Sequence, residues 1–316
     1  MLPPMAAKAK AKPKKTAGRP IITIVGPGRL GTALALALRK AGYRISEIVA
    51  RNNAQSMRRA RDLAKKVGAL AANDDAAVLN ANLVWFCVPD RDIAAVARGL
   101  ASRTNWKSHT AFHSSGALPS DELQVLRKQG AAVASVHPLM TFVRGAIPSL
   151  QGVPFAIEGD AAAARLARRI AQDLGGAGFT IRKQHKAAYH AWGAFTSPLL
   201  VSLLVTGEQV ARAAGLSVAE ARQKMLPIVR QTLANYAKLG PAGAFSGPLV
   251  RGDAEIVRKH LRTLKDVPAA TEVYLALAKS ALRYLPVRQR TELKKALAVV
   301  AIRNADSSLR PRLRQP

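Results

Sequence analysis

The chain has 316 residues, of which 49% are hydrophobic and 22% charged, and this length is enough for about two domains that each bury a core. Its single cysteine excludes an internal disulfide bond and a cysteine-rich metal cluster, and the six histidines are too dispersed to predict a metal site. The 49 lysine and arginine residues against 19 aspartate and glutamate residues give a formal net charge of +30.

Residues 1–20 carry six basic and no acidic side chains and mix alanine, lysine and proline without periodicity, which is typical of a disordered basic arm. A charge of this sign favours anionic partners, namely nucleotide phosphates, acidic metabolites or nucleic acid. The arginines are scattered, however, and aromatic residues make up only 5% of the chain, so charge on solvated faces is the simpler explanation. We therefore expect nucleic-acid binding to be weak and non-specific at most.

Strands and helices alternate from residue 21 to residue 183. Apolar or β-branched runs bounded by turn residues predict strands over 21–26, 44–51, 83–89, 111–115, 131–137 and 153–159. An alanine- and leucine-rich helix that ends at Gly42 and a basic helix over 53–67 follow the first two runs. This alternation predicts an α/β domain with a doubly wound parallel sheet of the Rossmann type and right-handed crossovers.

The pattern changes after residue 184, where helical periodicity replaces the strands. Helices are predicted over 185–206, 217–239, 253–264 and 269–284, with a loop at the prolines and glycines of 241–248. We expect an all-helical domain over 184–304 for substrate binding and dimerisation, and then a tail over 305–316. No uninterrupted run of about 18 apolar residues and no signal peptide is apparent, so we expect a cytoplasmic protein without membrane contact.

A glycine-rich turn joins the first predicted strand to the first predicted helix. In the pattern GxGxxG, the first glycine allows a sharp turn, the second lets the backbone approach a pyrophosphate, and the third lets helix and strand pack closely. The helix N-terminus then offers free N–H groups to phosphates. The sequence therefore predicts dinucleotide binding by a six-residue segment: Gly26, Pro27, Gly28, Arg29, Leu30 and Gly31.

The end of the second strand indicates which dinucleotide is bound. Proteins that bind NAD carry Asp or Glu there to hold the ribose hydroxyls, whereas this chain reads Ala50-Arg51-Asn52. A carboxylate would repel a 2′-phosphate, but a guanidinium pairs with it through two hydrogen bonds. We therefore predict NADP, with Arg51 at the 2′-phosphate. The alternative is that Arg51 is one more surface arginine.

Polar residues follow two later strands at the edge where an open α/β sheet binds its ligand. Pro89 closes one apolar run and is expected beside the cofactor, and Asp90 either caps the next helix or contacts a ligand. His113, Ser114 and Ser115 follow the next run. We expect Ser114 at the cofactor and His113 and Ser115 in proton transfer or hydrogen bonding to a carbonyl substrate. A helix cap and a structural histidine remain the alternative.

Three further residues are candidates for the substrate side. His137 ends a predicted strand in the sequence HPLMTF, and His190 lies in the first helix of the helical half. Arg251 lies in SGPLVRGD, where two glycines and a proline separate two helices. A loop this constrained that also carries charges is unusual for a connector alone, although a helix-capping role stays open. We assign His137 and Arg251 to substrate binding and His190 to catalysis.

The ordered set GPGRLG, VPD, HSSGAL, HPLMTF, YHAWGAF and SGPLVRGD resembles a bacterial family of Rossmann-like proteins whose C-terminal helical domain of unknown function is numbered 2520. The likeness covers residues 21 to 290. This family is similar to pyrroline-carboxylate, ketopantoate and deazaflavin-linked NADP oxidoreductases, and the HP motif is similar to that of prephenate dehydrogenases. One departure is Pro198, which stands where the family pattern usually has Asn, so a polar contact expected there is missing.

The motifs and the resemblance together imply an oxidoreductase that moves a hydride between NADP and a small acidic carbonyl or imine compound. A protein that binds NADP as a sensor, without turnover, is the alternative. The apolar segment over 198–205 is hard to bury in one small helical domain, so we also expect a homodimer.

Overall fold

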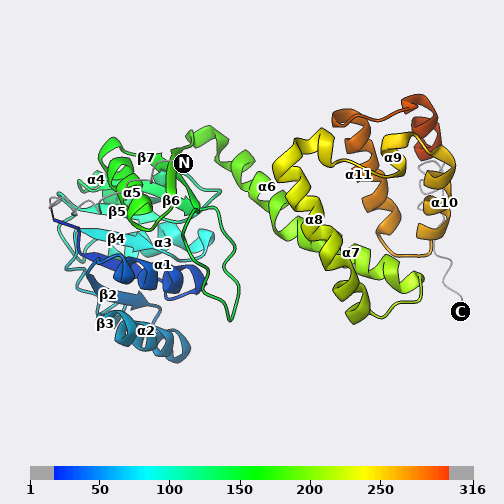
Figure 1. Cartoon of the computed structure of the whole chain (residues 1–316). Helices are drawn as coiled ribbons and strands as arrows, with labels where there is room; N and C mark the ends of the chain where they lie inside the picture. The colour runs from blue at the N-terminus through cyan, green and yellow to red at the C-terminus, as the bar shows by residue number, and fades with distance from the viewer. Residues whose placement is uncertain (1–17, 299–316) are drawn as a thin grey trace, which may run out of the picture. The chain divides into compact units, whose positions relative to one another are not determined.

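The computed structural model describes residues 18–298 and divides the chain into two compact units, Met1–Ala194 and Phe195–Pro316 (Figure 1). Most of the predicted basic arm (1–20) and all of the predicted tail (305–316) lie outside the described residues. The division at Ala194 falls inside helix α6 (Lys186–Thr196), close to the predicted start of the helical domain at residue 184.

The first unit is an eight-stranded sheet in the order β3-β2-β1-β4-β5-β6-β7-β8. Its strands are β1 (Ile22–Val25), β2 (Ile45–Ala50), β3 (Leu70–Asn73), β4 (Leu83–Phe86), β5 (Thr110–His113), β6 (Ala132–Pro138), β7 (Pro154–Gly159) and β8 (Ala177–Thr180). Its helices are α1 (Arg29–Lys40), α2 (Ala54–Val67), α3 (Ile93–Leu100), α4 (Gln124–Lys128) and α5 (Ala161–Asp173). The predicted Rossmann-type α/β architecture is confirmed.

The sheet is not parallel throughout. Strands β6 and β7 pair antiparallel, with His137 opposite Ala156, so the prediction of a parallel sheet was wrong at this one pair. The segment 139–153, which joins the two strands, contains no helix, whereas a parallel crossover usually runs through one. Strands β3 and β8 were also not predicted, because both are four residues long and only partly buried.

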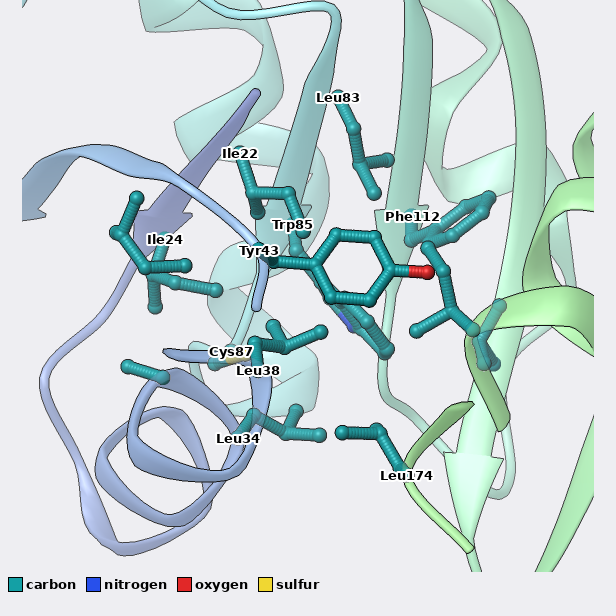
Figure 2. Close-up of a cluster of buried hydrophobic side chains, with 14 of the residues drawn as sticks. Ile22, Ile24, Leu34, Leu38, Tyr43, Leu83, Trp85, Cys87, Phe112 and Leu174 are labelled. Carbon is teal, nitrogen blue, oxygen red and sulfur yellow. The ribbon is translucent and has the colours of Figure 1, made fainter. Parts of the chain in front are cut away.

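Helices cover both faces of the sheet and bury it. Side chains from α1, α2 and α5 pack on one face, and side chains from α3 and α4 pack on the other. Figure 2 shows the first of these clusters, in which Trp85 and Phe112 of neighbouring strands meet edge to face at 5.3 Å between ring centroids. Tyr43 is fully buried in this cluster, and its hydroxyl donates a 2.6 Å hydrogen bond to Asp173. The buried sheet gives the loops at its carboxyl edge a rigid support.

The second unit is helical in its described part, as predicted. It contains α7 (Pro198–Ala213), α8 (Val218–Ala244), α9 (Pro248–Arg251), α10 (Ala254–Leu264) and α11 (Ala270–Tyr284). The predicted helix over 185–206 is two helices, because Pro198 lacks the N–H needed to continue α6 and instead opens α7. Helix α8 extends past the predicted end, with a kink at Gly240.

The core of the second unit is formed by α10, α11 and the segment with Leu293, Ala296 and Leu297, and α7 and α8 contribute almost nothing to it. Val257, Leu261 and Leu282 belong to this core. By contrast, the only buried residue of α7 is Glu208, which pairs with Arg222, and the only one of α8 is Ala221. The apolar side chains of α7 and α8 are therefore largely exposed.

One stretch of the described chain, Lys183–Ala213, is long and apolar enough to cross a membrane, with a mean hydropathy of 1.2 over an 18-residue window. This finding concerns length and composition only, and a break at Ser197 divides the stretch into α6 and α7.

Candidate functional site

The glycine turn has the geometry that dinucleotide binding requires. Gly26 has a φ of +103°, and a Cβ there would lie 2.7 Å from the Cys87 carbonyl oxygen. A Cβ on Gly31 would lie 2.1 Å from the Gly26 carbonyl oxygen, so helix α1 can approach β1 only with glycine at this position. Gly28 differs, because a Cβ there would meet no atom within 4 Å. The space that Gly28 leaves open is on the ligand side of the turn.

These differences predict opposite outcomes for two alanine substitutions in the same turn. Gly31→Ala should lower the free energy of unfolding by about 1–3 kcal/mol, because the backbone must move to admit the methyl group. Gly28→Ala should leave the melting temperature unchanged but weaken NADPH binding. Thermal denaturation and calorimetric titration of both variants would check this. A loss of stability in Gly28→Ala would contradict the assignment of that glycine to the ligand side.

A cavity of about 390 Å³ lies beside this turn, at the carboxyl ends of β1, β2 and β4. Of the predicted cofactor residues it is lined by Gly26, Pro27, Gly28, Arg51 and Pro89. Leu30 and Gly31 do not line it, and Gly31 instead supports the packing of the turn. The volume, the open position at Gly28 and the basic rim fit one half of a phosphorylated dinucleotide.

The start of α2 supplies polar groups to this cavity that were not predicted. Asn53 caps the helix, since its side-chain oxygen accepts a 2.9 Å hydrogen bond from the Ser56 N–H. This cap places Asn53, Ser56 and Arg59 on the cavity wall. Arg51 donates a 2.9 Å hydrogen bond to Asp92, so its charge is partly compensated. Arg59 has no ion pair within the described part of the chain, which makes it the stronger anion-binding group.

The loop after β5 is held by two side chains of the predicted site. Ser115 donates a 2.8 Å hydrogen bond to Asp90 and accepts hydrogen bonds from the N–H groups of Ala117 and Leu118. Ser114 accepts a 2.8 Å hydrogen bond from the indole N–H of Trp85. Both serines are buried, so they shape this loop.

His113 is fully buried, and both of its ring nitrogens are occupied by backbone groups. Nε2 lies 2.9 Å from the Pro119 carbonyl oxygen, and Nδ1 accepts a hydrogen bond from the Ser115 N–H. Burial lowers the pKa of His113 to about 4, against the effect of the Pro119 bond. With both ring nitrogens occupied, these surroundings favour the structural alternative, in which His113 holds the loop, and its assignment to catalysis stays a prediction.

His137 and His190 both lie close to Gly116. A Cβ on Gly116 would lie 3.0 Å from Nε2 of His137 and 2.9 Å from Cδ2 of His190. His137 is half-buried and shares a 2.8 Å hydrogen bond between Nδ1 and the Tyr189 hydroxyl, while His190 is exposed. Burial, then the charges of Lys186 and His190, lower the pKa of His137 to about 4, and burial raises the pKa of Tyr189 to about 12. The His137–Tyr189 pair is therefore neutral at pH 7.

Lys186, which was not predicted, lies beneath this group and is only 1% exposed. Its ammonium donates hydrogen bonds to the Ser115 carbonyl oxygen (3.1 Å) and to Ser135 Oγ (2.5 Å). Burial lowers its pKa to about 8, although the carboxylates of Glu158 and Asp90 oppose this. Among residues 18–298 its hydrogen bonds go to neutral acceptors, and a buried ammonium held in this way is costly and marks a candidate functional site. An isolated lysine three residues before a tyrosine gave no sequence signal of this burial.

Arg251 lies in the second unit, where its guanidinium pairs with Asp253 at 2.8 Å. Its assignment to substrate binding stays a prediction. Among residues 18–298, no group of three or more His, Cys, Asp or Glu side chains is arranged to hold a metal ion.

Two domain families match the chain. Residues 6–138 match the Rossmann-like domain, and residues 153–281 match the domain of unknown function DUF2520. The resemblance identified from the motifs is thereby confirmed. A search of curated proteins gives no match.

Solved structures of similar fold include oxidoreductases. A candidate NADP oxidoreductase from Bacteroides fragilis is 26% identical, with a TM-score of 0.69, and the alignment covers 83% of this chain and 97% of that one. A protein from Thermotoga maritima is 25% identical, with a TM-score of 0.65 and coverages of 89% and 100%. A reductive aminase from Aspergillus terreus in complex with NADPH shares the fold at 19% identity and a TM-score of 0.61, with coverages of 84% and 94%.

Proposed function

Since the chain joins a Rossmann-like domain to a DUF2520 domain, we propose that it is an NADP-dependent oxidoreductase acting on a small acidic carbonyl or imine compound. The observation that carries this proposal is the cavity at the glycine turn, with open space at Gly28 and two arginines on its rim. The similarity to a candidate NADP oxidoreductase over 97% of that protein's length supports it.

Different residues of the first unit would bind different parts of the cofactor. The turn from Gly26 to Gly31 would hold the pyrophosphate, and Arg51 and Arg59 would hold the 2′-phosphate. Pro89 would lie along the path from the pyrophosphate to the nicotinamide. When bound, NADP supplies or accepts the hydride.

The group around Gly116 faces the substrate in this proposal. If the Tyr189 hydroxyl donates to Nδ1 of His137, the ring proton lies on Nε2, where it can hydrogen-bond to the oxygen or nitrogen of the reacting double bond. The N–H of a neutral imidazole, held in place by Tyr189, can donate a hydrogen bond that stabilises the negative charge developing on such an atom. His190 is exposed beside it and would contact the acidic part of the substrate.

Lys186 is buried and would influence the group around Gly116 through its charge. Its positive charge lies beneath the Ser115–Gly116 backbone, in surroundings where charges are poorly screened. Together with burial, which has the larger effect, this charge lowers the pKa of His137, and it favours negative charge on the reacting substrate atom. Lys186 is therefore assigned an electrostatic and positioning role.

The choice of cofactor tests the first part of the proposal. Wild-type protein should bind NADPH more tightly than NADH. Arg59→Glu should weaken NADPH binding by about ten- to a hundredfold, because a charge-assisted hydrogen bond to the 2′-phosphate becomes a repulsion. Arg51→Glu should shift the preference in the same direction, towards NADH. Arg58→Glu is the matched control, since Arg58 does not line the cavity. Equal wild-type affinities for both cofactors in calorimetry would refute the NADP assignment.

Turnover tests the second part. NADPH oxidation should be followed by the loss of its absorbance, with keto acids, keto acids plus amines, and cyclic imino acids as substrates. Oxidation with one of these classes supports the reductase. Tight NADPH binding without oxidation by any of them would favour the sensor instead.

We also propose that the protein acts as a homodimer. Helices α7 and α8 expose their apolar side chains, including Val201 at 57%, Ile228 at 68% and Tyr236 at 59%. A helix that is apolar around much of its surface is normally buried. Nothing in the described part of a single chain buries the apolar side chains of α7. A second copy offers the same apolar surface, so a symmetric contact would cover both.

A further inference from the structure

A second cavity, of about 720 Å³, lies next to the glycine turn and is separate from the one assigned to the adenosine half of the cofactor. Its walls come from three segments: the start of α1, one face of α2, and the loop between β6 and β7, which Figure 1 shows as a long excursion from the sheet. The two cavities share only Pro27, Gly28 and Arg59.

Four cations line this second cavity against a single carboxylate, that of Asp62. They are Arg29 on α1, Arg59 and Lys66 on α2, and Arg144 on the loop between β6 and β7. Within residues 18–298 none of the four forms an ion pair, although other basic side chains, such as Arg51 and Arg127, do pair with carboxylates. The cavity therefore has an excess of positive charge that the protein itself leaves uncompensated.

This arrangement differs from scattered surface charge in two respects. The cations converge from elements that are far apart in the sequence, and they do so around a concave surface of the size that ligand sites have. On α2, Arg59 and Lys66 are seven residues apart and therefore share a face, whereas Lys65 and Arg58 of the same helix do not line the cavity.

We propose that Arg29, Arg59, Lys66 and Arg144 form a second subsite for a phosphoryl group. Three guanidinium groups can each donate two hydrogen bonds to phosphate oxygens, and the lysine adds a compact charge. The phosphoryl group belongs either to the bound dinucleotide or to a separate phosphorylated compound. Arg59 is shared with the 2′-phosphate site proposed above, whereas Arg29, Lys66 and Arg144 line only this second cavity. A simple phosphate anion tests the subsite without turnover.

Inorganic pyrophosphate is the probe, titrated calorimetrically into the full-length protein. The test variant is Lys66→Gln with Arg144→Gln, which removes one helix lysine and one loop arginine from this cavity alone. The matched control is Lys65→Gln with Arg103→Gln, which removes the same charges from exposed positions outside both cavities. The test variant should bind pyrophosphate about tenfold or more weakly, and the control should match the wild type.

A repeat of the titration with saturating NADPH separates the two sources of the phosphoryl group. If the dinucleotide fills the subsite, NADPH abolishes pyrophosphate binding, and the test variant also loses NADPH affinity. If a separate compound fills it, pyrophosphate still binds in the presence of NADPH, and the NADPH affinity of the test variant is unchanged. Equal pyrophosphate binding by test and control variants, or none by the wild type, would overturn the subsite. Melting temperatures of both variants confirm that they fold.

Discussion

Replacing Lys186 with methionine is expected to lower kcat by about 10²–10³-fold, the loss typical when a preorganised group that stabilises developing negative charge is removed. The fold should persist, because Ser135 Oγ also donates a 3.0 Å hydrogen bond to the Ser115 carbonyl oxygen and keeps the loop anchored. The pH dependence should change as well. With a pKa of about 8, the wild-type amine loses its charge as pH rises, so kcat should fall above pH 8, and the variant should lack this decline.

The same substitution has a consequence for stability that needs no substrate. The pKa of Lys186 is lowered from 10.5 to about 8 in the folded chain, so between these values the unfolded chain binds more protons than the folded one. Stability must then rise with pH over this range, by about 3 kcal/mol from this group alone. Below pH 8 the cost of burying the charge is fully present, and above 10.5 it is absent.

Urea denaturation at about pH 7, 8, 9 and 10 would measure this effect as the difference in the free energy of unfolding between wild type and Lys186→Met. Taking the difference cancels the titration of other groups, including Tyr189, whose pKa burial raises to about 12. Lys128→Met is the control, because Lys128 is exposed and no hydrogen bond or ion pair of its side chain occurs within the described residues. A difference that stays constant with pH would show that Lys186 is not a perturbed buried amine.

Disrupting the exposed face of α7 should have the second large effect. Val201 and Val205 lie four residues apart on this helix and are 57% and 46% exposed. The double substitution Val201→Glu with Val205→Glu places four carboxylates in the contact between two copies, which should separate them. Light scattering at micromolar concentration should give a mass of twice 33.6 kDa for the wild type and 33.6 kDa for the variant. The melting temperature of the wild type should rise with protein concentration.

The control for this experiment is Leu70→Glu with Val78→Glu, which alters two apolar residues of the first unit that are 74% and 67% exposed. This variant should keep the mass of the wild type. A wild-type mass of 33.6 kDa would refute the dimer. Sedimentation of that monomer with lipid vesicles would identify a membrane surface as the partner of α7, in line with the length and hydropathy of Lys183–Ala213.

The sequence predicts those parts of the fold and site that local chemistry determines. The turn from Gly26 to Gly31 could be recognised because Gly26 and Gly31 meet backbone requirements that only glycine satisfies, while Gly28 leaves space on the ligand side. The buried strand β4 could be recognised because all four of its residues are apolar. His137 and His190 were identified from motifs, but their shared closeness to Gly116 could be seen only in the fold.

Other features depend on contacts between distant residues, which no local pattern encodes. The burial of Lys186 follows from the packing of α6 beside β6, where Ser135 receives its ammonium. His113 looks like a catalytic residue in the sequence, but the Pro119 carbonyl occupies its second nitrogen. The antiparallel direction of β7 follows a connection, 139–153, that contains no helix, and no local pattern in the sequence indicates the direction of the strand after it.

Gly116 also determines how the site could be adapted to other substrates. A methyl group on this residue would press on two imidazoles that differ in freedom, because His137 is tied to Tyr189 and His190 is exposed. Directed evolution towards bulkier compounds would therefore begin at His190, whose replacement widens the site while the His137–Tyr189 hydrogen bond stays in place, at the expense of the contact proposed between His190 and the acidic part of the substrate. Enlarging position 116 would displace the tethered ring and narrow the range of compounds accepted.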